Sequence, residues 1–224
     1  NCKIDFIIRN LKSLSDSLKK SNIPLTVIHS DGFSDNANKI LNVINERLIS
    51  KVYWNNMFGV DENKRDQEVQ NILNKNNIDY ENFDDQVVYS PGTIKTKEDK
   101  PYSVFTPFKR RWIENFSTDF LDIQFNYTSK NYSGFDSNIN EFNFEFKKSH
   151  SVDMSLWNIG ETSAISILND YLDKKVLRYA KDRNDPIIEG TSRLSPYLAL
   201  GIISPKRCIL EALKKNNFEL DSGE

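Results

Sequence analysis

The sequence contains few of the residues from which disulfide frameworks and metal sites are built. Its 224 residues include two cysteines, Cys2 and Cys208, and two histidines, His29 and His150. The cysteines are far apart and form no CxxC pair, which argues against a disulfide framework and a structural zinc site. The histidines lie in no metal-ligand spacing and near no GxSxG motif, so the common hydrolase signatures are excluded. We expect a reducing, cytoplasmic location.

Long apolar runs and a strong excess of one charge are also missing. No segment approaches the ~18 apolar residues that a membrane span needs, and the mean hydropathy is −0.59. Thirty basic and thirty-two acidic residues give a formal charge of −2, so any contact with DNA must be local. Neither a Walker A loop nor GxGxxG appears, so a nucleotide site must be of another type. The chain begins without Met or a secretory segment, and we expect a missing front end.

The first half of the chain alternates predicted helices with predicted strands. Apolar residues recur at three- and four-residue steps in the helical segments, which is the period of one helix face. Short apolar runs closed by turn residues predict the strands. Strands that alternate with helices of this length pair in parallel and form an open α/β sheet. The predicted order is helix 6–20, strand 25–29, helix 33–48, strand 51–55, helix 61–73 capped by Asp61, and strand 86–90.

The second half changes character. Thr106 and Pro107 predict the N-cap and first turn of a helix that carries Phe108, Trp112 and Phe116. No sustained period follows, which predicts a long connection, and beyond it we expect only helices, at 161–171, 172–180, 196–202 and 205–215. The predicted organisation is a Rossmann-like α/β domain over 1–118, a linker over 119–153 and the start of an all-helical domain over 154–224.

Hydroxyl groups, an arginine and two proline-marked helix starts are concentrated in residues 179–205. In one interpretation, the serines before Pro196 and Pro205 cap two helices, and Gly190 turns the chain. In the other, hydroxyls, a guanidinium and unpaired helix amides form a cradle for a diphosphate, made by Thr191, Ser192, Arg193 and Ser195. The two interpretations are compatible, because amides exposed at a helix N-terminus are the ones that a phosphate uses.

This segment resembles the flavin-diphosphate region of the DNA photolyase and cryptochrome family. The resemblance rests on GTSRLSPYL at 190–198 and on GIISP at 201–205. FTPFK at 105–109 is similar to another helix of the family, and the combination with GTSRLSPYL is specific. Further matches in the family's order are Tyr179, Arg183, Pro186, Trp112, Trp54-Asn55 and Arg65-Asp66. The resemblance spans nearly the whole chain and implies an antenna-binding α/β domain, lacking its first strand, before an FAD-binding helical domain.

The resemblance also implies roles for individual residues. The positions that hold FAD in the family match Tyr179, Thr191, Ser192, Arg193, Leu194 and Ser195. Arg183 is similar to an arginine that contacts the phosphate backbone of damaged DNA, and the alternative is a solvated loop charge. Glu62 matches an acidic residue that contacts the antenna in members that use methenyltetrahydrofolate, although Asp61 stands where those members often have asparagine. The alternative is that Glu62 only stabilises a helix N-terminus.

As a whole, the resemblance implies a fragment of a class I type deoxyribodipyrimidine photolyase, which repairs cyclobutane pyrimidine dimers with light and reduced FAD. The flavin-ring pocket, the tryptophan relay and most of the dimer pocket lie beyond Glu224 in the family, so no catalytic residue is expected in this span. None of Trp54, Trp112 and Trp157 matches a relay position. The expected partner is UV-damaged DNA, with no membrane contact and a monomer at full length. Two alternatives are a cryptochrome-like light receptor and an inactive truncated remnant.

Overall fold

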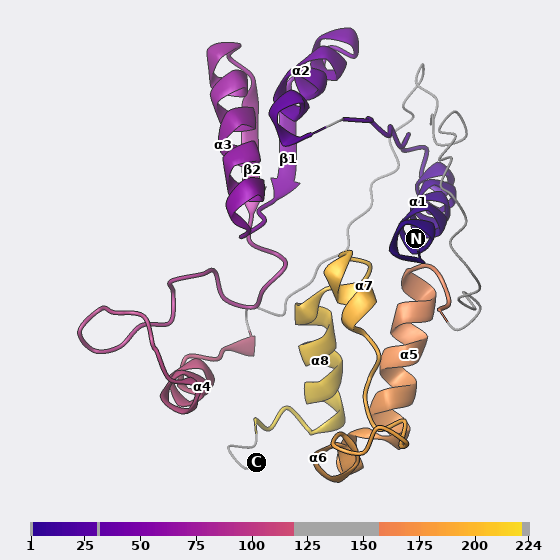
Figure 1. Ribbon diagram of the computed structural model, residues 1–224, viewed down its shortest axis with the longest axis vertical. Coiled ribbons are helices and arrows are strands. Elements are labelled where there is room, and N and C mark those ends of the chain that lie inside the picture. The colour runs from indigo at the N-terminus through magenta and orange to yellow at the C-terminus, as the bar shows by residue number, and fades with distance from the viewer. Residues whose placement is uncertain (1, 31, 119–156, 221–224) are drawn as a thin grey trace. The chain divides into compact units, whose positions relative to one another are not determined.

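The computed structural model describes residues 2–30, 32–118 and 157–220 (Figure 1). Its contacts divide the chain into two compact units. The helical unit comprises Asn1–Val27 and Leu121–Leu220, and the α/β unit comprises Ile28–Phe120 and Asp221–Glu224. The contacts thus group the first 27 residues with the later helices, which differs from the expected domain range 1–118. The domain boundaries of the family, at 1–118, 119–153 and 154–224, stay a prediction.

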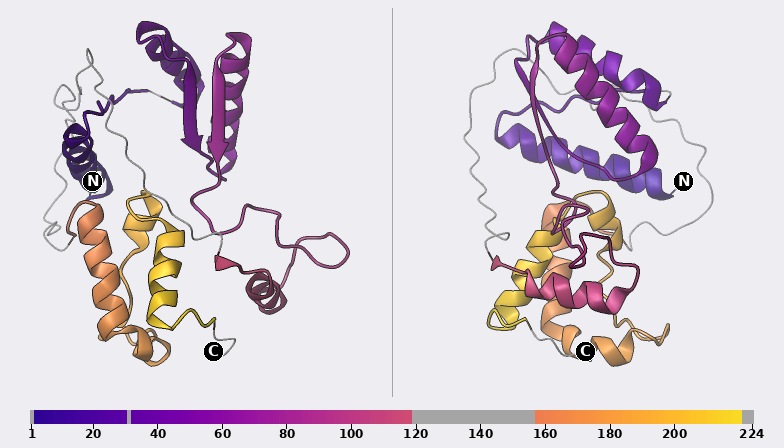
Figure 2. Two further views of the ribbon diagram at one scale, coloured as in Figure 1. Left: turned by 180° about the vertical axis from the view of Figure 1, so that it is seen from behind. Right: turned by 90° about the vertical axis from the view of Figure 1, so that its left-hand side faces the viewer.

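The α/β unit is built on two strands that pair in parallel, the pairing that the sequence predicts, although only the strand at 51–55 was itself predicted. Strand β1 (Lys51–Asn55) pairs in parallel with β2 (Asp79–Phe83), and helix α3 (Val60–Lys75) connects them. Helix α2 (Asn36–Glu46) follows the short 3-10 helix η1 (Phe33–Asp35). Figure 2 shows α2 and α3 on the same side of the strands. The core between them contains Ala37, Ile44, Val69 and Leu73, with Val52, Trp54, Ile78 and Tyr80 packed against it.

Two predicted strands are wrong. Residues 25–29 form no strand, and the chain at 86–90 bends instead of pairing. The second strand lies earlier, at β2, where the acidic residues alternate with Tyr80 on the covered face. Tyr89 has a different role, because its hydroxyl donates to the carbonyl of Asn115 at 2.7 Å and its ring contacts Trp112 edge-on. A tertiary contact therefore overrides the β-propensity of this segment.

Helix α4 (Phe105–Glu114) ends the described part of the α/β unit. It begins one residue before the predicted cap, so Thr106 lies inside the helix, and the N-cap is Val104, which makes no side-chain cap bond. A similar correction applies to α3, whose N-cap is Gly59 and whose first turn contains Asp61. The helices themselves are confirmed, because apolar periodicity, rather than the cap, determines where they form.

The helical unit combines the first helix of the chain with the last five helical segments. Helix α1 (Cys2–Lys20) contributes Phe6 to the core of this unit, where its ring contacts Tyr197 edge-on at 5.5 Å and Leu168 of α5 (Glu161–Lys174) belongs to the same cluster. After α5 come η5 (Val176–Arg178) and α6 (Tyr179–Asp182) in place of the single helix expected at 172–180. Helices α7 (Ser195–Ala199) and α8 (Pro205–Lys215) complete the unit. The α/β class followed by helices is therefore confirmed.

Polar contacts fix α1 to the segment that begins at Trp157. The Asn10 amide donates to the carbonyl of Phe6 at 2.8 Å and accepts from the Gly160 backbone N–H at 2.8 Å. Arg9 donates through Nη2 to the Trp157 carbonyl at 3.0 Å. Asn10 is buried and both ends of its amide are satisfied, so this contact stabilises the unit instead of costing desolvation energy.

Candidate functional site

The residues predicted to hold a flavin diphosphate lie in one stretch of the helical unit. Tyr179 begins α6, and a loop follows that ends at the start of α7. This stretch contains all of the FAD candidates, which are Tyr179, Thr191, Ser192, Arg193, Leu194 and Ser195. The antenna candidate Glu62 belongs to the α/β unit.

Gly190 holds the loop against the end of α6. A Cβ atom at this position would meet the Asp182 backbone and side chain, which no rotamer can avoid. Asp182 is itself buried, and its carboxylate forms an ion pair with Arg178 at 3.2 Å. Only glycine allows this approach, so Gly190 does more than turn the chain.

The backbone of Arg193 is left-handed, with a φ of +55°, as it is at several turn residues of the chain such as Asn22 and Asn77. The Nη2 atom of Arg193 donates to Glu189 Oε1 at 2.8 Å, and both side chains are more than half exposed. The guanidinium carries five N–H donors, and within the described residues only this one bond is formed. Most of its donors can therefore bind an anion.

The hydroxyl groups of the loop divide into two kinds. Thr191 and Ser195 are exposed, whereas the Ser192 hydroxyl accepts from the Leu194 N–H at 3.4 Å. Ser195 is the first residue of α7, whose N-cap is Leu194, so the prediction that Ser195 caps this helix is wrong. Leu194 is buried in the core and anchors the loop. Two free hydroxyls beside a guanidinium with free donors fit a diphosphate.

Tyr179 and Arg183 form one contact. The Arg183 guanidinium lies 5.3 Å from the centre of the Tyr179 ring, and this ring contacts Tyr171 edge-on at 6.3 Å. Burial raises the pKa of the Tyr171 phenol. Arg183 is exposed, and the face of the Tyr179 ring holds its charge at the surface. This position is compatible with both predicted roles, a DNA contact and a solvated loop charge.

Glu62 lies in the first turn of α3, close to the N-cap. Its carboxylate bends back over Gly59, where a Cβ atom would be 2.0 Å from Oε2. A carboxylate in this position interacts favourably with the positive end of the helix dipole. The geometry therefore supports the interpretation that Glu62 stabilises the N-terminus of α3. Its contact with an antenna stays a prediction.

Two residues of the site were not predicted from the sequence. Glu189 and Asp182 control the loop through an ion pair and a close backbone approach, respectively. For Glu189 a signal was present, since it stands four residues before Arg193 with opposite charge. For Asp182 there was none, because its contact with Gly190 depends on how the loop returns to α6.

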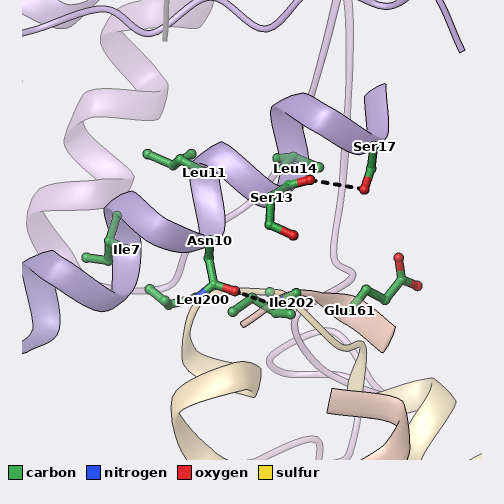
Figure 3. A pocket seen from close by; sticks show the side chains of 11 residues that line it. Ile7, Asn10, Leu11, Ser13, Leu14, Ser17, Glu161, Leu200 and Ile202 are labelled. Carbon is green, nitrogen blue, oxygen red and sulfur yellow. Dashed lines mark hydrogen bonds between the residues drawn. The ribbon is translucent and has the colours of Figure 1, made fainter. Parts of the chain in front are cut away.

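A cavity of the helical unit contains none of the predicted residues. It measures about 260 Å³ and lies between α1, the start of α5 and the segment after α7 (Figure 3). Its walls are mainly apolar, with Asn10 and Ser13 on one side and Glu161 at the edge. Among residues 2–30, 32–118 and 157–220, no group of three or more His, Cys, Asp or Glu side chains could hold a metal ion. The described helices also include none long and apolar enough to cross a membrane.

An α/β unit, a helical unit and an exposed loop of hydroxyl and arginine side chains define a two-part protein with a candidate diphosphate site. The family model for DNA photolyase matches residues 1–124, and the chain therefore belongs to the DNA photolyase family. The deoxyribodipyrimidine photo-lyases of Vibrio cholerae and Escherichia coli are each 29% identical to it. These alignments cover 98% of this chain but 47% and 46% of the two relatives, so the chain spans about half of their length.

Two solved structures share the fold. A bacterial class III photolyase from Agrobacterium tumefaciens matches with a TM-score of 0.74 and 24% identity, over 97% of this chain and 45% of that one. A cryptochrome from Synechocystis matches with a TM-score of 0.67 and 16% identity, over 99% of this chain and 47% of that one. The fold is therefore common to photolyases and cryptochromes.

Proposed function

We propose that the whole protein is a deoxyribodipyrimidine photolyase that repairs cyclobutane pyrimidine dimers in DNA. Family membership and the names of the curated relatives support this activity. Damaged bases are the least costly to extrude from a duplex, so a dimer is selected partly by its weak stacking. The family uses flavin cofactors, and FAD would supply the electron that splits the dimer in light.

The observation that carries the proposal is the loop from Gly190 to Ser195. Arg193 would bind the diphosphate through its free N–H groups, and Thr191 and Ser195 would donate their hydroxyls to the same oxygens. Leu194 anchors the backbone, and Tyr179 would contact the ribityl portion. These residues bind and orient the cofactor, and none of them takes part in the chemical step.

Three further assignments complete the proposal. Arg183 would contact a phosphate of damaged DNA. Glu62 would contact a methenyltetrahydrofolate antenna. The full-length protein would act as a cytoplasmic monomer, with the α/β domain at 1–118, a linker and the helical domain from 154 onward.

The test is FAD binding by this chain and by the complete protein, measured by absorbance and by fluorescence of released flavin. Loss of the bidentate anion contact in Arg193→Ala removes about 1.5–3 kcal/mol, which corresponds to roughly a 10- to 150-fold weaker affinity for FAD. Arg111→Ala is the control, since Arg111 is also an exposed, ion-paired arginine. Unchanged FAD affinity in Arg193→Ala would remove the assignment.

The Synechocystis match keeps a cryptochrome-like light receptor as the second candidate. Photoreduction and repair of a dimer-containing oligonucleotide by the complete, flavin-loaded protein separate the two. Repair in light establishes the photolyase, whereas photoreduction without repair favours the receptor.

A further inference from the structure

The segment around α4 has a charge opposite to that of the chain. Residues 86–118 contain six basic and three acidic side chains, so their formal charge is +3, while the whole chain has −2. A protein without a chain-wide positive field can attract a polyanion only where its basic residues gather. This segment is therefore one place where such a contact can form.

One face of α4 is covered by its own preceding loop. The Phe108 ring contacts Tyr102 edge-on at 6.1 Å, and Trp112 contacts Tyr89 edge-on at 5.4 Å. Trp112 also stacks on Phe116. These aromatic contacts fix the preceding segment to α4, the helix labelled in Figure 1.

The other face of α4 is open. Phe105 and Lys109 lie one turn apart, as do Thr106 and Arg110, so the four side chains share this face. Phe105 is 73% exposed. A groove along the helix is lined by Thr106, Lys109, Arg110, Ile113 and Glu114. We call Phe105, Thr106, Lys109 and Arg110 the α4 face.

The cations of this face are not neutralised. Within the described parts of the chain, Lys109 and Arg110 form no ion pair, in contrast to Arg111, which pairs with Glu114 at 3.2 Å. Two adjacent cations, a hydroxyl donor and an exposed ring are the groups that bind a nucleic-acid backbone, where lysine, arginine and threonine contact phosphates and an aromatic ring stacks on a base.

We propose that the α4 face is a contact surface for the phosphate backbone of DNA, separate from the loop at Gly190–Ser195 and independent of flavin. Its chemistry favours a nucleic acid over a lipid surface. An interfacial helix must insert a broad apolar face, whereas Phe108 and Trp112 are engaged by Tyr102 and Tyr89, which leaves Phe105 as the one exposed aromatic ring of α4.

The test is binding of an undamaged DNA duplex by the full chain, measured by fluorescence anisotropy over a series of salt concentrations. In Lys109→Gln/Arg110→Gln, the slope of log K against log salt concentration should become shallower by about 1.8, because two phosphate contacts are lost. The affinity at low salt should fall by roughly tenfold. Lys64→Gln/Lys75→Gln is the matched control, since it removes two exposed lysines from α3 of the same unit. It should leave the slope unchanged.

A conservative variant and a ring deletion sharpen the result. Lys109→Arg/Arg110→Lys keeps both charges and should bind like the unmodified chain. Phe105→Ala should weaken binding of single-stranded DNA by roughly fivefold or more at an unchanged slope. Circular dichroism confirms that the variants fold.

Three outcomes would overturn the proposal: equal slopes in the α4 and α3 double variants, no DNA binding by the unmodified chain, or charge-dependent binding to anionic phosphatidylserine vesicles without DNA binding. If the α4 double variant lowers the salt slope of DNA binding in a chain that binds no FAD, the α4 face is established and the proposed flavin site is removed. If the chain binds FAD and the α4 double variant leaves the slope unchanged, the flavin site stands and the α4 face is overturned.

Discussion

Gly190 lies so close to Asp182 that a Cβ atom on Gly190 would be 2.5 Å from the Asp182 Cβ and 2.9 Å from its carbonyl carbon. The loop and the end of α6 are therefore in close contact, at the point where the proposed diphosphate site begins. Asp182 is buried and paired with Arg178, so a shift of its backbone would disturb both its packing and that ion pair.

Gly190→Ala should displace the loop and weaken FAD binding by at least tenfold, because a methyl group cannot be placed without moving backbone. The measurement is FAD titration, with thermal unfolding followed in parallel. Gly32→Ala is the control, since nothing lies within 4 Å of the position of its Cβ and its φ is extended. Equal FAD affinity in both variants would show that the close approach is not required.

Glu189→Gln should tighten FAD binding about two- to fivefold, the range of an exposed ion pair. The Glu189 carboxylate pairs with the guanidinium proposed to bind the diphosphate, and glutamine keeps a hydrogen-bond acceptor while it removes the competing charge. Riboflavin, which has no phosphate, is the control ligand and should bind equally to both proteins. Weaker FAD binding would instead mean that Glu189 positions Arg193.

Arg183→Ala should lower the affinity for dimer-containing DNA and reduce its salt slope by about one, as the loss of one phosphate contact predicts. Lys12→Ala removes an exposed charge from α1 and should not change the slope. An identical slope in Arg183→Ala would assign this arginine to the solvated loop, where the Tyr179 ring already holds it.

Tyr197→Phe should cost about 1 kcal/mol of stability, because the fully buried phenol donates to the Asn158 carbonyl at 2.7 Å. Burial also raises the pKa of Tyr197 above its ordinary value of 10.0. The unfolded chain then ionises first, so this part of the stability is present below pH 10 and is lost as the pH rises through the folded pKa. Urea unfolding on both sides of that pH should show a smaller alkaline loss in Tyr197→Phe. An equal loss would assign the alkaline sensitivity to other groups.

The sequence was informative where local periodicity and tertiary packing agree. Strand β1 alternates covered and open side chains, α2 shows a clear apolar stripe, and α3 keeps Val69, Ile72 and Leu73 at helical spacing, so these elements were predicted. Strand β2 was missed because its charged residues lower its β-propensity, while the more apolar segment around Tyr89 packs against Trp112. The caps of α3, α4 and α7 were misplaced by one or two residues, since cap geometry depends on backbone angles that composition does not determine.

The candidate site divides in the same way. Thr191, Arg193 and Ser195 were predicted, because a chain of hydroxyls beside an arginine has a direct chemical meaning. The contact between Gly190 and Asp182 was beyond prediction, because it depends on the path of the loop between them. The left-handed backbone of Arg193 is likewise a result of tertiary structure.

The two hydrogen bonds that tie α1 to the segment at Trp157 join residues 148 and 150 positions apart. During synthesis, α1 leaves the ribosome long before its partners exist. At the usual rate of about 5–20 residues per second, the delay is roughly 8–30 s. Over that time the apolar side of α1, with Phe6 at its centre, has no native surface to cover it. The helical unit can therefore complete its core only after the segment at Trp157 and α5 have been synthesised.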